Sequence, residues 1–268
     1  MRAKIKLGII GFGNMGKAIS DAFCADKNYT IHAYDQDRAK TRRVKKVSVA
    51  NSAQDVISLS DILILAIKPQ DLPQFLKDCG ADLARGKPLL ITIAAGVSTR
   101  YFEKNIKGVR VIRVMPNLAA KIRESVSLIC KGKNAKKSDF LKAKMIFSGV
   151  GELIVASEKL MDKASSISGS GPGLVFYIMN CMYESAHALG FKKSDAKKMV
   201  LQTFFGSVKL AKLSKDDFKC LVNQVASKKG TTQAGLKSFK SDKLNQVINR
   251  GVNAAYTRAA QLSQRYGG

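Results

Sequence analysis

Gly11-Phe-Gly-Asn-Met-Gly16 is the most informative segment of this chain for its fold. It fits the pattern GxGxxG, in which the first glycine allows a tight turn, the second lets the backbone approach a pyrophosphate, and the third permits close packing of a helix on a strand. The apolar run Lys4–Ile10 precedes it and the helix-compatible run Lys17–Cys24 follows it. This order predicts a dinucleotide-binding unit whose helix start offers free N–H groups to phosphate. The alternative is a glycine-rich turn with a structural role only.

An acidic residue after the next expected strand, Thr30–Tyr34, bears on the choice of dinucleotide. A carboxylate at this place, here Asp35, accepts hydrogen bonds from a ribose 2′-OH and favours NAD. Four basic residues follow closely: Arg38, Lys40, Arg42 and Arg43. They can neutralise a 2′-phosphate and so favour NADP, and a carboxylate beside that phosphate is unfavourable. We expect NADP as the cofactor, with NAD as the alternative.

Further short β-rich runs alternate with segments that are long enough for helices. These runs are Val47–Val49, Ile62–Ile67, Leu89–Ile93, Val109–Val114, Ser125–Lys131 and Gly151–Ala156. Such alternation predicts a parallel, doubly wound sheet. After about Glu158 the strand-like runs stop, and helix-compatible runs follow at Leu174–Leu189, Ser194–Leu213, Asp216–Val225, Thr231–Phe239 and Ser241–Tyr266. We therefore expect an α/β fold with a Rossmann domain over residues 1–158 and an all-helical domain over residues 159–268.

The charge of the chain at first suggests a nucleic-acid partner. Among 268 residues, 46 are basic and 20 acidic, which gives a formal net charge of +26. The excess is spread over both halves, however, and the richest run, Arg38–Lys46, holds no aromatic residue on which bases could stack. We therefore expect a solvated basic surface and no nucleic-acid partner.

Residues that often carry enzyme chemistry are scarce or scattered. The only histidines are His32 and His187, so a three-histidine zinc site is excluded, and neither lies in a triad motif. The five cysteines are widely spaced without a CxxC, which favours reduced thiols in the cytoplasm and no metal site. The longest strong apolar run, Ile62–Ile67, is far too short to span a membrane, and glycines interrupt the apolar N-terminus. We expect neither a membrane segment nor a signal peptide.

Four further segments combine small residues with turn signals. They are Ala66-Ile-Lys-Pro-Gln70, Ile93-Ala-Ala-Gly96, Arg113-Val-Met-Pro-Asn117 and Ser168-Gly-Ser-Gly-Pro172. The first three end apolar strands, and the carboxyl ends of strands in an open α/β sheet line the ligand crevice. Small residues there let a flat nicotinamide ring approach the backbone. The alternative is that these are ordinary strand-to-loop turns.

Taken in this order, the segments resemble those of pyrroline-5-carboxylate reductases over nearly the whole chain. Met161-Asp162 and Gly230-Thr-Thr232 extend the resemblance into the helical half. It implies reduction of L-1-pyrroline-5-carboxylate to L-proline by hydride transfer from NAD(P)H, the last step of proline biosynthesis. It also implies that the helical domain is a dimerisation domain, and that homodimers assemble further into decamers.

The resemblance also assigns site residues. The cofactor would contact Gly11, Phe12, Gly13, Asn14, Met15, Gly16, Ile67, Lys68, Pro69, Ala94, Ala95, Gly96, Met115, Pro116 and Asn117. Asp35 and Arg38, which follow the second expected strand, add to this set by the argument given above. The substrate would contact Glu158, Ser168, Gly169, Ser170, Gly171, Gln224, Gly230, Thr231 and Thr232. The Thr232 hydroxyl would bond the ring nitrogen and orient the imine, and Glu158 would stabilise its positive charge. The alternatives are a helix cap for Thr232 and an exposed surface carboxylate for Glu158.

The implied chemistry suits a chain that is poor in histidine. A protonated cyclic imine is already electrophilic at carbon, so alignment of hydride donor and acceptor dominates over acid–base catalysis. The substrate carboxylate still needs an anchor, and Gly230-Thr-Thr232 before an apolar helical run can supply N–H groups at a helix start.

Two segments depart from the family pattern. Leu118-Ala-Ala120 stands where the family often has Thr-Pro-Ala, and Lys228-Lys-Gly230 stands where it usually has Pro-Gly-Gly. If residue 229 requires a positive φ, a lysine there is unfavourable by on the order of 1 kcal/mol.

Two other functions compete with this assignment. Another NAD(P)-dependent imine or 2-hydroxyacid reductase is one, and the hydroxyacid type is disfavoured because Leu174–Leu189 contains no lysine to donate a proton. A non-catalytic dinucleotide- or nucleic-acid-binding protein is the other, and it leaves the MPN, SGSGP and GTT segments unexplained.

Overall fold

The computed structural model describes residues 4–42, 44 and 46–266, so Arg43 of the basic run lies outside the described residues. The described strands form one sheet in the order β3-β2-β1-β4-β5-β6-β7-β8. They are β1 (Ile5–Ile10), β2 (Tyr29–Tyr34), β3 (Ser48–Val49), β4 (Ile62–Leu65), β5 (Leu89–Thr92), β6 (Arg110–Met115), β7 (Ser125–Lys131) and β8 (Gly151–Val155). Each predicted strand is present, and the strand order reverses between β1 and β4, the switch point of a doubly wound sheet.

The sheet is mostly parallel, and its last two strands are the exception to the prediction. β7 pairs antiparallel with β6, with Val114 opposite Ile129, and β8 pairs parallel with β7, so both run opposite to the other strands. β6 ends at Met115 and β7 begins at Ser125, and this connection is shorter than the dozen or more residues that a parallel crossover needs. The chain instead turns back through a short 3-10 helix, η3 (Leu118–Ile122).

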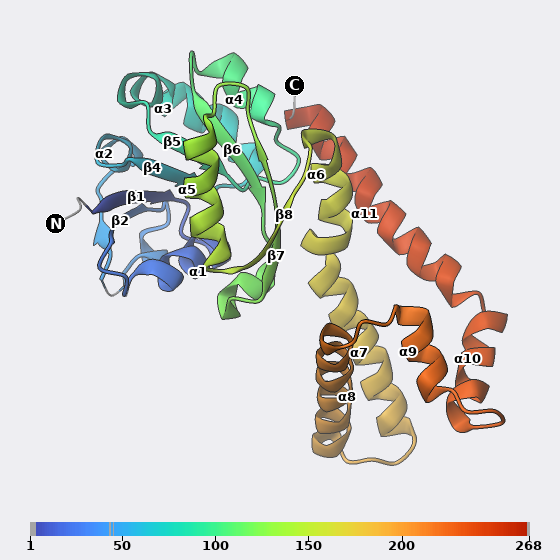
Figure 1. The fold of residues 1–268 in the computed structure, drawn as a ribbon. Helices are drawn as coiled ribbons and strands as arrows, with labels where there is room; N and C mark the ends of the chain where they lie inside the picture. Colours follow the sequence, from blue (N-terminus) through green and yellow to red (C-terminus); the bar gives the residue numbers. More distant parts are fainter. Residues whose placement is uncertain (1–3, 43, 45, 267–268) are drawn as a thin grey trace. The chain divides into compact units, whose positions relative to one another are not determined.

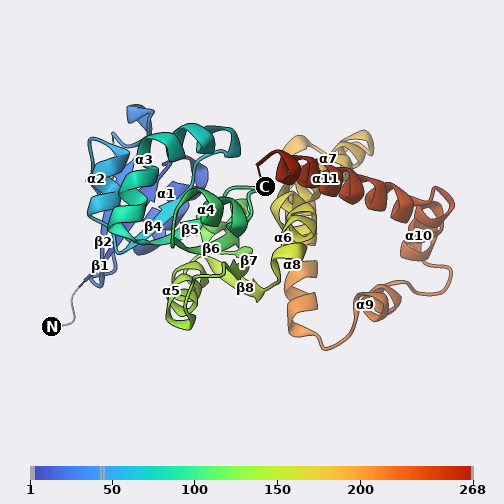
Figure 2. The same ribbon diagram turned by 90° about the horizontal axis from the view of Figure 1, so that it is seen from above.

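Helices cover both faces of the sheet. One face carries α1 (Asn14–Phe23) and α5 (Lys137–Ser148), and the other carries α2 (Ala53–Ser58), α3 (Leu72–Gly86) and α4 (Thr99–Asn105). Successive side chains of a strand point to opposite faces, so Ile9 packs in the first core and Ile10 in the second. The elements can be followed in Figure 1, and Figure 2 shows α3 and α5 on opposite sides of the sheet.

By internal contacts the chain divides into two compact units, residues 1–172 with 254–268, and residues 173–253. The remaining elements are α6 (Glu158–Ala164), a π-helical turn η4 (Ser165–Gly169), α7 (Gly171–Ala188), α8 (Lys193–Leu213), α9 (Phe218–Val225), α10 (Thr231–Ser241) and α11 (Leu244–Tyr266). The five predicted helical runs are confirmed, whereas α6 and η4 were not predicted. α7 begins three residues before the predicted start, because Pro172 suits the first turn of a helix.

Large apolar side chains of the second unit are uncovered in a single chain. Tyr177, Phe205 and Phe218 are 71%, 63% and 81% exposed. An apolar surface of this kind is typical of a face that another chain covers. Among the described helices, none has both the length and the apolar character that crossing a membrane requires.

Candidate cofactor and substrate site

The glycine-rich turn lies at the carboxyl end of β1, and its glycines are needed for different reasons. Gly11 has a φ of +92°, and a Cβ there would lie 2.5 Å from the Ala66 carbonyl oxygen. A Cβ on Gly16 would overlap the Gly11 carbonyl oxygen. A Cβ on Gly13 would meet nothing within 4 Å. Packing within the protein therefore explains the first and third glycines, while the second faces the open space that a pyrophosphate would fill at the start of α1.

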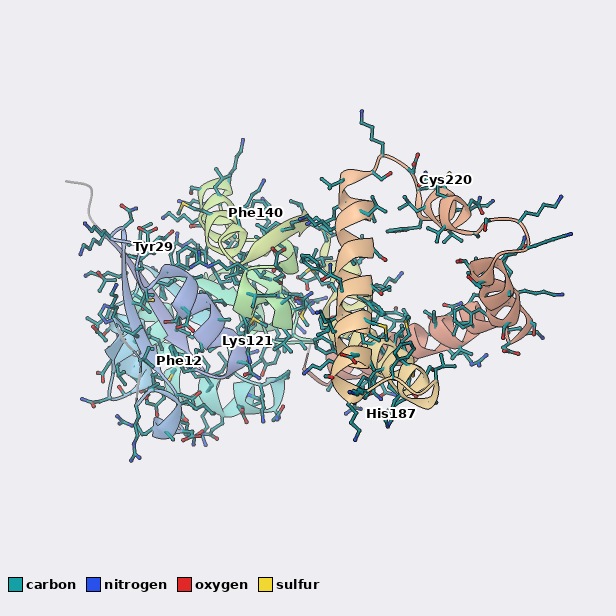
Figure 3. The ribbon with its side chains drawn as sticks, turned by 90° about the horizontal axis from the view of Figure 1, so that it is seen from below. Phe12, Tyr29, Lys121, Phe140, His187 and Cys220 are labelled. Carbon is teal, nitrogen blue, oxygen red and sulfur yellow. The ribbon has the colours of Figure 1, made fainter. Side chains whose placement is uncertain are left out.

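A cavity of about 830 Å³ opens beside this turn, and its lining is strongly basic. The charged side chains that line it among the described residues are Lys17, Lys40, Arg42, Lys121 and Asp21. Phe12 and Lys121, both labelled in Figure 3, come to the same cavity from the glycine-rich turn and from η3. Four cations against one carboxylate suit a ligand with several negative charges, so the residues present fit a dinucleotide.

Asp35 directs its carboxylate into the protein. The residue is 8% exposed, and its Oδ2 accepts the Phe12 N–H at 2.6 Å. Its Oδ1 accepts the Asp37 N–H at 2.9 Å and the Lys40 ammonium at 3.1 Å. The carboxylate thus braces the glycine-rich turn from the end of β2 and holds Lys40 at the cavity.

The neighbouring basic residues differ in where their charges lie. Arg38, an expected cofactor contact, donates from Nη2 to the Asn51 carbonyl oxygen at 2.9 Å and does not line the cavity. Lys17 and Lys121 do line it, although sequence reasoning did not select them. Lys17 directly follows the GxGxxG motif, which is a signal that could have been used. Lys121 reaches the cavity because it lies on η3, and no feature of the sequence around it indicates a cofactor contact.

The other predicted cofactor segments lie along the same edge of the sheet. Ile67–Pro69 follows β4, Ala94–Gly96 follows β5, and Met115–Asn117 ends β6. β1, β4, β5 and β6 are mutually parallel neighbours, so these carboxyl ends lie on the side of the glycine-rich turn. The structure therefore brings these segments together as the motif order implied.

The Ala94–Gly96 turn also supports the end of the chain. Gly96 has a φ of +70°, and a Cβ on it would lie 2.9 Å from the Leu262 Cβ. Glycine at this position therefore allows the last turns of α11 to lie directly against the turn. Residues 254–266 accordingly belong with the sheet, although the rest of α11 belongs to the second unit.

The SGSGP segment lies against the MPN segment. Residues 165–169 form a π-turn, in which the Ser170 N–H bonds the Ser165 carbonyl at 2.9 Å. The buried Ser168 donates its hydroxyl to a carbonyl four residues earlier. A Cβ on Gly169 would lie 3.2 Å from the Met115 Cε, so this glycine sets a close approach of the two motifs. Single π-turns of this kind are frequent at functional sites.

Glu158 begins α6, and both of its carboxylate oxygens are already bonded within the protein. Oε1 accepts from Arg113 at 2.5 Å, and Oε2 accepts the Thr99 hydroxyl at 2.7 Å and the Cys130 thiol at 3.5 Å. Arg113 also donates to Asp162 at 2.6 Å. These contacts tie the end of β6 to the starts of α4 and α6.

Titration of this cluster follows from burial and charge. Arg113 is 1% exposed, and burial acts to lower its pKa, but Asp162 and Glu158 outweigh burial and the pKa is raised. Burial, followed by the nearby Glu158 charge, raises the pKa of the Cys130 thiol to about 12. Sequence reasoning missed Arg113 as a functional residue. An arginine inside an apolar strand was the available signal, because a buried guanidinium needs carboxylate partners.

The remaining predicted substrate residues lie in the second unit. Gly230 is the N-cap of α10, and Thr231 and Thr232 are the first residues of that helix. The N–H groups of a first turn have no intrahelical acceptors, so this start can receive an anion. Gln224 lies on α9 and donates from Nε2 to Asp216 Oδ2 at 2.7 Å.

Lys229 adopts a left-handed backbone conformation, as expected for a position where the family usually has glycine. Its φ is +63°, and its N–H donates to Gln233 Oε1 at 2.7 Å. The loop before α10 therefore keeps a conformation that favours glycine, although a lysine occupies it.

Comparisons with known proteins extend over nearly the whole chain. The sequence model described as pyrroline-5-carboxylate reductase dimerisation matches residues 158–262, and that described as NADP oxidoreductase, coenzyme F420-dependent, matches residues 6–96. The pyrroline-5-carboxylate reductase of Synechocystis is 33% identical over 97% of this chain and 99% of its own. That of Methanosarcina acetivorans is 34% identical over 97% and 98%.

Solved structures agree with the sequence comparisons. The crystal structure of Plasmodium falciparum pyrroline carboxylate reductase with NADP bound has a TM-score of 0.89 at 25% identity, covering 98% of this chain and 100% of that one. A pyrroline-5-carboxylate reductase from Coxiella burnetii has a TM-score of 0.85 at 28% identity, covering 96% and 98%.

Proposed function

The chain belongs to the pyrroline-5-carboxylate reductase family, and from that premise we propose how its own residues serve the reaction. It reduces L-1-pyrroline-5-carboxylate to L-proline with a hydride from NAD(P)H, the last step of proline biosynthesis. NADP is the supported cofactor, with NAD possible. The observation that carries this conclusion is identity of 33–34% over nearly the full length of both proteins.

Activity can be tested directly with purified protein. NADPH and pyrroline-5-carboxylate are mixed with it, the loss of reduced nicotinamide is followed, and the product is identified. Proline formation that depends on enzyme concentration is expected. A proline yield no higher than in the reaction without enzyme would contradict the assignment.

For the cofactor, the proposed contacts run along the carboxyl edge of the sheet. The open space at Gly13 and the start of α1 would receive the pyrophosphate, and Met115–Asn117 would lie beside the nicotinamide. Ile67–Pro69 and Ala94–Gly96 would contact the parts between them. When bound, the cofactor supplies the hydride, and the protein contributes binding, orientation and electrostatics.

For the substrate, the proposed anchor is the start of α10. The free N–H groups of its first turn would bind the carboxylate. The Thr232 hydroxyl oxygen would accept a hydrogen bond from the N–H of the protonated imine. This orients the electrophilic carbon. Ser168–Gly171 and Gln224 are proposed as further substrate contacts. Gly230 at the N-cap position has no side chain that could cap these N–H groups, which leaves them for a ligand.

For Glu158, the proposed role is electrostatic and is exerted from a fixed position. Its oxygens are bonded to Arg113, Thr99 and Cys130, so the carboxylate is held in one place. Arg113 carries one positive charge between the two negative charges of Glu158 and Asp162. The group therefore retains one net negative charge, which favours a cationic imine nearby.

The chain forms homo-oligomers through the dimerisation region that its sequence matches at residues 158–262. We propose that the basic assembly is a dimer and that dimers associate further into decamers. Light scattering on the chromatographed protein tests this, and a mass that stays at the dimer at all concentrations would contradict the decamer.

We also propose that the protein works in the cytoplasm. All five cysteines are free, and a reducing compartment keeps thiols in that state. Cell fractionation with an antibody to the chain tests the location, and recovery outside the cytoplasmic fraction would contradict it.

A further inference from the structure

Asp35 occupies the place at the end of β2 where a free carboxylate would bind a ribose 2′-OH and repel a 2′-phosphate. Here the carboxylate is not free. One oxygen accepts the Phe12 N–H, and the other accepts the Asp37 N–H and the Lys40 ammonium. With its side chain 9% exposed, Asp35 braces the glycine-rich turn and is neutralised by Lys40.

Local structure fixes the position of Lys40. The short 3-10 helix η1 (Arg38–Lys40) is capped by Asp37, whose side chain accepts the Ala39 N–H at 3.0 Å. The cap holds the Lys40 Nζ 3.1 Å from Asp35 and 3.9 Å from Asp37. The Lys40 side chain is still 45% exposed and lines the basic cavity, so its ammonium can contact a second anion there.

The other nearby cations do not share this arrangement. Arg42 lines the cavity, but among the described residues it is Lys40, and not Arg42, that binds the Asp35 carboxylate. The Arg38 guanidinium donates to the Asn51 carbonyl oxygen, away from the cavity lining. Lys40 alone among these three both neutralises Asp35 and faces the cavity.

We propose that Lys40 determines the preference of this enzyme for NADPH over NADH. It offsets the repulsion that Asp35 would exert, while Asp37 lies farther from its ammonium, and together with Arg42 it binds the 2′-phosphate on the adenosine ribose. Asp35 then acts as the brace of the glycine-rich turn. The inference rests on the cofactor site proposed above and names the residues that select the cofactor within it.

Binding of two adenosine fragments by calorimetry tests the proposal without relying on turnover. Adenosine 2′,5′-bisphosphate carries the selecting phosphate, and adenosine 5′-monophosphate lacks it. In Lys40→Met we expect the affinity ratio of bisphosphate over monophosphate to fall on the order of tenfold or more, as loss of a charge-assisted hydrogen bond implies. In Arg42→Met we expect weaker bisphosphate binding with no gain for the monophosphate.

A double variant separates neutralisation of Asp35 from direct contact with phosphate. Asp35→Asn keeps an oxygen that can accept the Phe12 N–H but removes the charge. Added to Lys40→Met, it should recover part of the lost bisphosphate affinity. Lys77→Met is the matched control, because Lys77 is exposed on α3, outside the cavity lining, and it should keep the wild-type ratio.

The outcomes are distinguishable. A wild-type ratio in a folded Lys40→Met protein overturns the proposal, as does a larger loss in Arg38→Met than in Lys40→Met. If the wild-type protein binds neither fragment, nor NADP⁺ or NAD⁺, the proposed cofactor site itself fails. Thermal unfolding of every variant verifies that a change in binding is not a loss of fold.

Discussion

Arg113 and Glu158 form an ion pair at 2.5 Å that joins the end of β6 to the start of α6. The Arg113 side chain is 2% exposed, and Asp162 binds its other terminal nitrogen at 2.6 Å. Its Nε has no partner among the described residues. The pair places α6, and through it the η4 turn, beside the strand that ends in the MPN segment.

Removing the arginine should destabilise the protein strongly. Arg113→Met keeps most of the side-chain volume but leaves two carboxylates without their buried counter-charge, and breaking such a pair costs about 3–5 kcal/mol. Urea unfolding measures the change. Arg85→Met is the control, since Arg85 is 80% exposed and its 3.7 Å pair with Asp82 is worth about 0–1 kcal/mol. Equal losses in the two variants would show that the buried cluster has no special role.

Alanine substitutions at Gly11 and Gly13 should separate the effect of this turn on stability from its effect on cofactor binding. Gly13→Ala adds a methyl group to open space, so the unfolding free energy should stay near wild type while NADP⁺ affinity falls by about tenfold or more. Gly11→Ala forces a positive φ on alanine and should destabilise the fold by about 1–3 kcal/mol. Calorimetric binding and urea unfolding give both quantities. Wild-type affinity in Gly13→Ala would exclude the phosphates from this turn.

The Thr232 hydroxyl should contribute to catalysis through one hydrogen bond. Its loss in Thr232→Ala should lower kcat/KM on the order of tenfold, the equivalent of about 1.4 kcal/mol. Thr232→Ser retains the hydroxyl and should recover most of the activity, and equal unfolding free energies of the alanine and serine variants would show that the hydroxyl acts on the substrate and not as a helix cap. A folded alanine variant with wild-type kcat/KM would remove Thr232 from the mechanism.

Replacing the strained lysine should stabilise the loop before α10. Lys229 has a φ of +63°, so Lys229→Gly should raise the unfolding free energy by about 1 kcal/mol. Lys228→Gly is the control, because residue 228 is not among those with positive φ, and there glycine only increases the freedom of the unfolded chain. The prediction fails if the two substitutions shift urea unfolding in the same direction by the same amount.

Stability should fall at alkaline pH through the buried thiols. The pKa of Cys130 is raised from its ordinary 9.0 to about 12 by burial and by Glu158, so its contribution is complete below pH 9 and is lost as the pH rises towards 12. Within this window the unfolded chain releases a proton that the folded chain keeps, a slope of about 1.4 kcal/mol per pH unit.

Two cysteine variants test the alkaline prediction by urea unfolding across the window. Cys130→Ala should flatten the slope most. Cys79→Ala should flatten it over a narrower range, because burial raises that pKa to about 11. An unchanged slope in Cys130→Ala would contradict the expected role of the buried thiol.

Local patterns in the sequence predicted the elements well and their partners poorly. Each strand is predicted, because short apolar runs between turns are local signals. The reversed direction of β7 and β8 depends instead on the length of the connection between β6 and β7. The start of α1 was placed at Lys17 and lies at Asn14, since the glycine-rich turn itself forms the first turn of the helix.

Contacts between distant segments explain what the sequence could not predict. Glu158 meets Thr99 across 59 positions of chain, and no spacing rule joins them. Arg38 and Lys40 are equally basic neighbours, yet only the folded geometry sends one to the Asn51 carbonyl and the other to Asp35. The motif residues could be selected from sequence, while the residues that hold them in place required the tertiary structure.

The contact between Gly96 and Leu262 has a consequence for the order in which the protein is made. Residues 254–266 pack with a sheet whose last strand ends at Val155, so roughly a hundred residues are synthesised between that strand and the helical segment that joins it. During synthesis, the turn after β5 stays exposed until Leu262 has been translated. The nucleotide-binding half of the enzyme is therefore complete only after this later segment of the chain has been synthesised.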